Sequence, residues 1–308
     1  MKNILITGGA GFVGYHLTRA LIKKGMKISV IDNLSTGKIE NIPKKIEFIK
    51  GDIRDKKTLE LVTSNCDVII HLAAKTNIQE SIKKPKDFIE INTIGTALIT
   101  EICLKKNIKI IFFSSCSVYP LKYKKKILES SKLDPESPYA ISKLAAEKII
   151  SFYTKYFGLK SYILRPFNIY GSRQSHESEY SAVIPKFITK SLNNDELTIY
   201  GNGNQKRDFV NVNDIITACI KCLSNDEKNK YGIYNVGTGT AISIIDLAKT
   251  IIKITGKGKI VYKPPKKTDA NFSCADIGKI KKNLNFAVKN NFKNSIYKLI
   301  KSWKRNTL

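Results

Sequence analysis

The stretch Thr7-Gly8-Gly9-Ala10-Gly11-Phe12-Val13-Gly14 lies between an apolar run, Asn3 to Thr7, and a segment with helical spacing, Phe12 to Lys24. Its glycines at 8, 11 and 14 are three residues apart. Without Cβ atoms the backbone can turn tightly, let a pyrophosphate approach and let the helix pack on the strand. Glycines also form ordinary turns, but this place between a strand and a helix favours a dinucleotide site, with phosphates at the helix N-terminus. We expect its contacts from Gly8, Gly11, Phe12, Val13 and Gly14.

Outward from this motif, short apolar runs alternate with helical patterns over the first 120 residues. This rhythm is typical of parallel strands that helices cover on both faces. We therefore predict an α/β fold, a doubly wound parallel Rossmann sheet of about seven strands, with a smaller interleaved substrate-binding lobe. The predicted Rossmann domain is 1–170, to which 207–237 return, and the predicted lobe comprises 171–206 and 238–308.

Composition limits the class of protein. Of the 308 residues, 42% are hydrophobic and 26% charged, which suits a packed globular chain. The sequence contains no apolar run near the roughly 20 residues that span a bilayer, and its start does not resemble a signal peptide. Six cysteines without a tight framework suit a reducing compartment, so we expect a cytoplasmic protein.

The formal net charge is +27, a balance that can indicate nucleic acid or an anionic membrane as a partner. The lysines, however, are spread along the whole chain. We favour a lysine-rich solvated surface over a dedicated polyanion site, and we expect neither a membrane nor nucleic acid as partner. Cys219 and Cys222 form a CxxC pair without a second pair, so we expect no metal site.

Asp32 lies eighteen residues past Gly14, at the end of the second predicted strand. A carboxylate there accepts hydrogen bonds from the adenosine ribose and repels a 2′-phosphate, so NAD is favoured over NADP. The alternative is a turn aspartate before Asn33. We also expect Asn33 at the cofactor, and Asp52 and Ile53, after the third strand, beside the adenine.

The second constellation is Ser137-Pro138-Tyr139-Ala140-Ile141-Ser142-Lys143. Pro138 suits a first helical turn, and Tyr139 and Lys143, four residues apart, share one helix face. A free tyrosine has a pKa of about 10, and an adjacent ammonium is expected to lower it toward that of a useful base. The alternative is a chance surface pair.

Ten motifs in order give the chain a resemblance to a known family. They are TGGAGFVG (7–14), DNLSTG (32–37), GDIRD (51–55), HLAA (71–74), NTIGT (92–96), SSCSVY (114–119), SPYAISK (137–143), LRPFNIYG (164–171), RDFVNVND (207–214) and YNVGTG (234–239). The chain resembles the extended short-chain dehydrogenase/reductase family, and in particular its NAD-dependent UDP-sugar 4-epimerases.

The resemblance implies a role for each matching residue. Tyr139 is the acid/base, Ser115 hydrogen-bonds the reacting sugar oxygen, and Lys143 binds the nicotinamide ribose. The further cofactor contacts that it implies are Leu72, Ala73, Ala74 and Asn92. The substrate contacts that it implies are Asn168, Val183, Arg207, Lys266, Asp269 and Ser273. It also implies a homodimer formed by the helices near 86–106 and 137–157, with Ile91, Ile94, Leu98, Leu144 and Ile149 at the interface.

Several reactions of the family remain open. Related dehydratases and decarboxylases carry an extra acid where this chain has Cys116 and Ser117, and dehydration needs that acid/base group. Cys116 also resembles the acid/base cysteine of GDP-fucose synthases, although the partnering histidine is displaced to His176. The sequence is also compatible with a UDP-glucuronate 4-epimerase, with a reductase that exchanges its cofactor, and with a non-catalytic RNA-binding member of the family. Epimerisation at C4 through a 4-keto sugar fits best.

Overall fold

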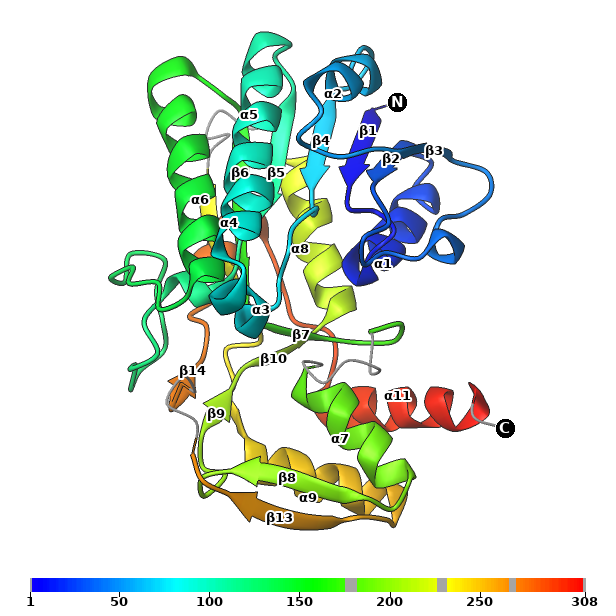
Figure 1. The fold of residues 1–308 in the computed structure, drawn as a ribbon, viewed down its shortest axis with the longest axis vertical. Helices are drawn as coiled ribbons and strands as arrows, with labels where there is room; N and C mark the ends of the chain where they lie inside the picture. Colours follow the sequence, from blue (N-terminus) through cyan, green and yellow to red (C-terminus); the bar gives the residue numbers. More distant parts are fainter. Residues whose placement is uncertain (1, 175–181, 226–231, 266–269, 307–308) are drawn as a thin grey trace. The chain divides into compact units, whose positions relative to one another are not determined.

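The computed structural model describes residues 2–174, 182–225, 232–265 and 270–306 (Figure 1). Its central sheet has seven strands in the order β11-β6-β5-β4-β1-β2-β3. The strands β1 to β6 pair in parallel with their neighbours, which confirms the predicted α/β sheet. Their bounds are β1 (Asn3–Thr7), β2 (Lys27–Asp32), β3 (Glu47–Lys50), β4 (Val68–His71), β5 (Lys109–Phe113), β6 (Ser161–Pro166) and β11 (Gly232–Val236).

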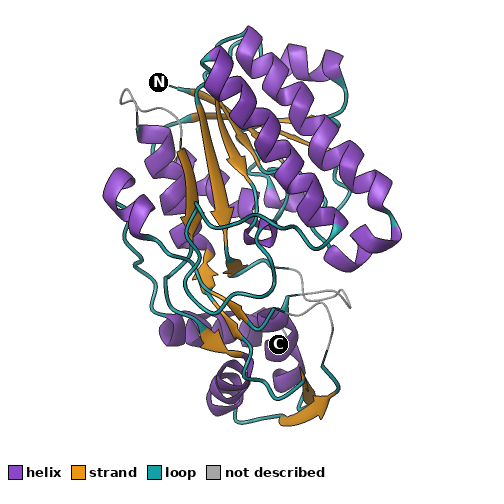
Figure 2. Ribbon diagram, turned by 90° about the vertical axis from the view of Figure 1, so that its left-hand side faces the viewer, coloured by secondary structure: helices purple, strands orange, loops and turns teal. Residues whose placement is uncertain are grey.

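Helices cover both faces of this sheet (Figure 2). They include α1 (Phe12–Ile22), α2 (Lys56–Val62), α5 (Gly95–Lys105), α6 (Pro138–Phe157) and α8 (Val212–Ser224). Side chains of α2, α5 and α6 pack on one face with apolar strand residues such as Leu5, Ile110 and Ile163. A sheet buried on both faces needs continuous apolar strands, which is why they read as unbroken apolar runs in the sequence.

The helix expected over 86–106 is interrupted. The structure has α3 (Ile78–Lys83), α4 (Pro85–Phe88), a π-helical segment over Ile89–Ile94 and then α5. At the junction, a Cβ on Gly95 would lie 2.6 Å from Ile53 Cδ1, so the helix packs closely against the side chain of Ile53 in the loop after β3. Segments of π-helix inside α-helices are frequent at functional sites.

Helix α6 has clear local signals at both ends. The Ser137 hydroxyl accepts the Ala140 N–H at 3.1 Å, Pro138 occupies the first turn, and Gly158 ends the helix in the left-handed conformation. The start is therefore one residue after the cap, which places Tyr139 and Lys143 in the first two turns.

The chain divides into two compact units. The first comprises 1–119, 133–165 and 216–234, and the second 120–132, 166–215 and 235–308. Compared with the predicted boundaries, the second unit also takes 120–132, 166–170, 207–215 and 235–237. The segment expected to rejoin the main sheet near Phe209 instead forms β10 (Phe209–Asn211), which pairs with β7 (Asn168–Tyr170).

The second unit has three small sheets and its own core. The sheets are β10-β7, β12-β9-β14 and β13-β8. Their other strands are β8 (Glu196–Tyr200), β9 (Lys206–Arg207), β12 (Ile242–Ser243), β13 (Lys259–Lys263) and β14 (Phe272–Ser273). The helices are α7 (Val183–Leu192), α9 (Ile244–Thr255), α10 (Gly278–Leu284) and α11 (Phe292–Asn306). Apolar residues of α7, α9, α11 and β8 form the core. Across the described parts of the chain, no helix is both long and apolar enough to cross a membrane.

Candidate active site

The glycine-rich loop joins β1 to α1. Gly8 has φ +72°, and a Cβ there would lie 2.6 Å from Ala73 N; a Cβ on Gly14 would lie 2.5 Å from Gly9 Cα. These two glycines therefore serve the chain's own packing. At Gly11 the nearest described atom to a Cβ would be the Gly8 oxygen at 3.3 Å, so the missing side chain leaves an approach to the start of α1. Within the described residues no side chain caps this helix, which leaves its first N–H groups for a ligand.

Asp32, at the end of β2, braces the same loop. Its Oδ2 accepts the Ala10 N–H at 3.0 Å and its Oδ1 accepts the Leu34 N–H at 2.8 Å. A carboxylate offers about four acceptor positions, so each oxygen keeps capacity for a ribose hydroxyl. Asp32 is thus both part of the loop and suited to its predicted role.

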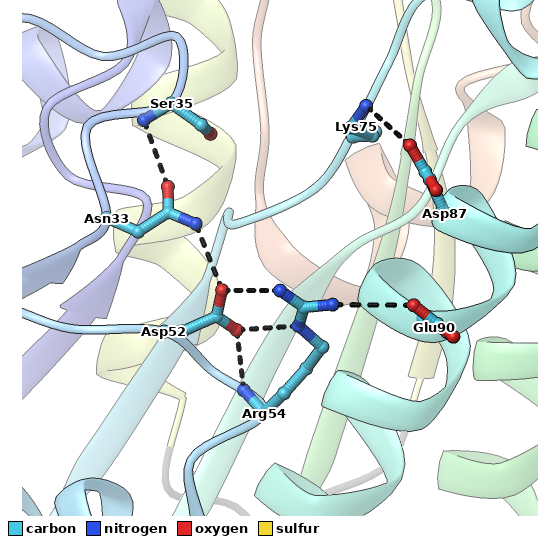
Figure 3. A network of polar contacts seen from close by, with 7 residues as sticks. All are labelled: Asn33, Ser35, Asp52, Arg54, Lys75, Asp87 and Glu90. Atoms are coloured by element: carbon cyan, nitrogen blue, oxygen red, sulfur yellow. Dashed lines mark hydrogen bonds and ion pairs between the residues drawn. The ribbon is translucent and has the colours of Figure 1, made fainter. Parts of the chain in front are cut away.

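Asp52 lies in a polar network that joins the loops after β2 and β3 (Figure 3). Arg54 donates from Nε and Nη2 to the two Asp52 oxygens at 2.9 Å each, and Asn33 Nδ2 donates at 3.1 Å. These contacts, Arg54 first, hold the pKa of Asp52 at about 2. Arg54 also lies 3.5 Å from Glu90. The side chain of Ile53, by contrast, is buried in the core.

The predicted catalytic residues Ser115, Tyr139 and Lys143 belong to the same unit. Ser115 follows β5 and caps a short 3-10 turn, accepting the Ser117 N–H at 3.1 Å. Tyr139 is 8% exposed and Lys143 3%. The Lys143 Nζ lies 4.4 Å from the ring centroid of Phe112, a cation–π arrangement that orients the ammonium.

Burial sets the protonation of both groups. Burial raises the pKa of Tyr139 to about 12, and a hydrogen bond with Ser115 partly offsets this rise. Burial also lowers the pKa of Lys143 to about 7, and the Glu147 carboxylate partly offsets this fall. The expectation of a lowered Tyr139 pKa is therefore wrong for the protein alone. Desolvation of the phenolate is the largest effect, and the hydrogen bond with Ser115 offsets only part of it.

Asn92, a predicted cofactor contact, makes hydrogen bonds to two elements beside the catalytic residues. It is 1% exposed, and its Oδ1 accepts the Lys75 N–H at 2.8 Å while its Nδ2 donates to the Lys75 oxygen at 2.9 Å and to Ser142 Oγ at 3.0 Å. Ser142 Oγ in turn donates to the backbone carbonyl oxygen of Tyr139 at 2.7 Å. Both amide hydrogens are used, so Asn92 ties the loop after β4 to the first turn of α6.

The model of one protein family, "NAD dependent epimerase/dehydratase family", matches residues 4–237. The chain belongs to this family. A protein of Methanocaldococcus jannaschii assigned as a UDP-glucose 4-epimerase is 39% identical over 280 residues, 90% of each chain. The relatives of this chain also include dTDP-D-glucose 4,6-dehydratases.

Two solved structures are similar over the whole length. The UDP-glucose 4-epimerase of Thermotoga maritima, with UDP-glucose, has a TM-score of 0.94 at 32% identity and covers 99% of this chain and 100% of its own. The UDP-N-acetylglucosamine 4-epimerase of Methanobrevibacter ruminantium M1 has a TM-score of 0.93 at 33% identity and covers 100% and 99%.

Membership of the epimerase/dehydratase family confirms the predicted cofactor, NAD. The residues present fit it. Gly11 leaves the cradle at the uncapped helix start that a pyrophosphate needs, and Asp32 has free acceptor capacity. Leu72 and Ala73 lie against this loop, since Leu72 N donates to the Thr7 oxygen at 3.1 Å and Ala73 N to Thr7 Oγ1 at 3.2 Å. Ala74 follows them, half-buried.

Three of the predicted substrate residues gather in the second unit. Ser273 pairs with Arg207 between β14 and β9, and the Asn168 N–H donates to the Asp208 oxygen at 3.0 Å. The buried Asp208 side chain holds this region by accepting the N–H groups of Thr238, Gly239 and Ala275. Val183 begins α7. Lys266 and Asp269 lie outside the described residues.

The sequence analysis missed a cavity of about 490 Å³ in the second unit. Pro265 and Asn271, which flank Lys266 and Asp269 in sequence, contribute to it. Its other lining residues are Tyr200, Gly201, Asn202, Asn204 and Gln205. In the sequence, this region is marked only by Gly201-Asn202-Gly203-Asn204, a run typical of a turn, and both glycines have positive φ in the structure. Turn residues alone do not reveal a cavity.

Proposed function

We propose that the protein interconverts the C4 configuration of a UDP-hexose or UDP-N-acetylhexosamine through a 4-keto sugar. The observation that carries this proposal is the placement of Ser115, Tyr139 and Lys143 together at the end of β5 and the start of α6, in a chain similar to 4-epimerases over its length. These are the residues that the chemistry requires: a hydroxyl for the sugar oxygen, an acid/base and a cation.

NAD, when bound, supplies the hydride acceptor and donor for C4. Tyr139 takes the 4-hydroxyl proton and returns it after the sugar has turned, while Ser115 hydrogen-bonds the same oxygen. Because the pKa of Tyr139 is about 12 in the protein alone, this phenol needs positive charge beside it to act as a base. Lys143 is the cation on its helix face. Net redox is zero, so no NADH is consumed.

Dehydration and decarboxylation fit less well. Relatives include enzymes of both kinds. The resemblance implies an extra acid in such enzymes at the positions where this chain has Cys116 and Ser117. Cys116 is half-buried beside Ser115, which keeps open a reductase that uses a cysteine as its acid/base.

The deciding experiment is incubation of purified protein with UDP-Glc, UDP-GlcNAc and UDP-GlcA, without added NADH, with products read by NMR. An epimerase produces the C4 epimer of at least one substrate. A product that has lost water or CO₂ would replace the proposal by dehydration or decarboxylation, and turnover that requires NADH would replace it by net reduction.

The substrates include N-acetylated sugars. This proposal rests on Ser273, a small residue beside Arg207 where epimerases confined to plain hexoses tend to carry a bulky Tyr, and on the similar UDP-N-acetylglucosamine 4-epimerase. A phenol ring would fill the volume that a 2-acetamido group needs, and such a clash costs about 1–3 kcal/mol. Ser273→Tyr should lose UDP-GlcNAc turnover selectively, with Ser273→Ala as matched control. An unchanged ratio of UDP-Glc to UDP-GlcNAc activity would contradict the assignment.

A homodimer is also proposed. Ile94 is 49% exposed on the π-helical segment, and Ile141 and Phe152 are 48% and 50% exposed on α6. Helices α5 and α6 lie side by side in Figure 1. Of the residues expected at the interface, Ile91 and Leu98 pack on the protein's own core, while Leu144 and Ile149 are half-buried. Covering the exposed apolar side chains is the reason to expect a second copy.

A further inference from the structure

The stretch 33–41, which follows β2, folds back onto the glycine-rich loop and is fastened to it at Ala10. The Ala10 oxygen accepts the Asn41 Nδ2 hydrogen at 2.7 Å and the Lys38 N–H at 3.2 Å. The Ala10 N–H donates to Asp32 Oδ2, at the end of β2, at 3.0 Å. Both backbone polar groups of this fully buried residue are therefore bound by one continuous piece of chain.

The contact between the two loops leaves no room for a side chain at Gly37. A Cβ there would lie 2.7 Å from Ala10 Cβ and 3.0 Å from the Ala10 carbonyl carbon, and real Cβ atoms essentially never come closer than 3.0 Å to another heavy atom. The missing side chain lets the stretch 33–41 pack directly on the loop that is suited to pyrophosphate.

Arg19 of α1 holds the far end of the same stretch. Its Nη1 donates to the Asn41 backbone oxygen at 2.7 Å and to the Tyr15 backbone oxygen at 3.3 Å. The guanidinium carbon lies 3.7 Å from the centroid of the Tyr15 ring, a cation–π contact that limits where the guanidinium can go. Asn41 is thus held by α1 through its backbone and holds Ala10 through its side chain.

We propose that Asn41 is a positioning residue for NAD, which together with Arg19 keeps the stretch 33–41 closed on the glycine-rich loop and so slows release of the cofactor. The two surfaces that it joins are those suited to the adenosine ribose, at Asp32, and to the pyrophosphate, at Gly11. A dinucleotide that spans both surfaces leaves more readily when they separate, and a contact made before binding keeps them in the bound arrangement. The inference requires NAD, but it is independent of which sugar the protein turns over.

The test measures NAD release from the full-length protein. Protein saturated with NAD is diluted into an excess of deuterium-labelled NAD, and mass spectrometry of the bound dinucleotide gives the rate constant of exchange. Asn41→Asp keeps the size of the side chain but replaces the donor by a carboxylate, which only accepts hydrogen bonds and would face the Ala10 oxygen. Release should become about 2- to 10-fold faster, which corresponds to the loss of one hydrogen bond. Arg19→Met should act in the same direction.

Two further variants separate the closure of the loops from other effects. Gly37→Ala removes no hydrogen bond, but its methyl group forces the two loops apart, so it should also accelerate release. The matched control is Glu40→Gln, at the exposed position beside Asn41, which should leave the rate constant within about twofold of the wild type.

Hydrogen–deuterium exchange distinguishes positioning from a general loss of stability. In Asn41→Asp the backbone amides of 33–42 should exchange faster, while those of β5 stay as protected as in the wild type, because local opening leaves the core closed. Faster exchange in β5 as well would overturn the inference.

A rate of NAD release in Asn41→Asp within twofold of the wild type would also overturn it. Where Asn41→Asp does not fold, unchanged release from both Arg19→Met and Gly37→Ala has the same consequence. Failure of the wild type to turn over any UDP-sugar would refute the proposed function instead, because the exchange of NAD needs no turnover.

Discussion

The buried His71 should make the protein sensitive to mild acid. Its Nδ1 lies 2.7 Å from Thr7 Oγ1 and its Nε2 2.9 Å from Thr96 Oγ1. Thr96 donates its hydroxyl hydrogen to the Asn92 oxygen at 2.6 Å, so it can only accept from Nε2–H. Thr7 then donates to Nδ1 and accepts the Ala73 N–H. The hydrogen bond from Thr7 to Nδ1 requires the neutral imidazole, because a protonated Nδ1 cannot accept.

Burial, with a smaller effect from Lys143, lowers the pKa of His71 to about 3. In the unfolded chain the pKa of histidine is about 6.5. Between these values the unfolded state binds the extra proton, so stability falls as pH falls, by about 1.4 kcal/mol per pH unit. From pH 6.5 to pH 4.5 the loss attributable to His71 is about 2.3 kcal/mol, a large share of the roughly 5–15 kcal/mol that stabilises a typical protein.

The assay is urea unfolding at pH 6.5, 5.5 and 4.5 for the wild type and for His71→Asn and His71→Gln. Both variants cost absolute stability, since neither amide reproduces both threonine contacts, but neither titrates. Other groups contribute equally to all three proteins, so the wild type should lose about 2.3 kcal/mol more than either variant over this range. If the variants decline as steeply as the wild type, to within about 0.5 kcal/mol, then His71 is not held neutral and the reasoning fails.

Further predictions concern three other features of the chain. Tyr139→Phe should lower turnover by about 100- to 10,000-fold while UDP-sugar binding persists, as for the loss of a general acid/base, and retention of more than about a tenth of the rate would exclude Tyr139 as the base. Lys109→Met should lower the free energy of unfolding by about 2 kcal/mol in urea titrations, because the buried Nζ donates to the oxygens of Cys222, Leu223 and Asn225 at 3.0–3.3 Å. The control is Lys23→Met at an exposed position, which should change the free energy of unfolding by less than about 0.5 kcal/mol. Equal effects of the two substitutions would refute a stabilising role of the Lys109 hydrogen bonds. Light scattering at micromolar concentration should give the mass of a dimer, and a monomer mass would refute the proposed assembly.

The parts of the fold that sequence predicted well are those with strong local causes. The glycine loop can form only where three missing Cβ atoms coincide with a strand and a helix, and at Gly8 and Gly14 the structure shows how little space a side chain would have. The start of α6 follows from Ser137 and Pro138, two residues with a defined place at a helix N-terminus.

The second unit was harder to predict from the sequence, because its strands pair with residues that are distant along the chain. Strand β9 has two residues, and its partner β14 lies more than 60 residues later. What orders this region is the buried Asp208, whose side chain accepts hydrogen bonds from residues near 238 and 275. Residues in such short strands carry no periodicity, so the sequence analysis extended the main domain through 207–215. The π-helical segment that turns Asn92 inward has no local sequence signal either.

The misjudged protonation of the active site has a single physical cause. From sequence, Lys143 is visible as a charge one turn from Tyr139, and pairing alone would lower the tyrosine pKa. The burial of both side chains depends on tertiary packing and is not visible in the sequence. It raises the pKa of Tyr139 and lowers the pKa of Lys143, and both shifts favour the neutral form of the group. At neutral pH the protein alone therefore holds a phenol beside a partly neutral amine. The Ser115 hydrogen bond favours the phenolate of Tyr139, and the Glu147 carboxylate favours the ammonium of Lys143, but burial is the larger effect on both groups.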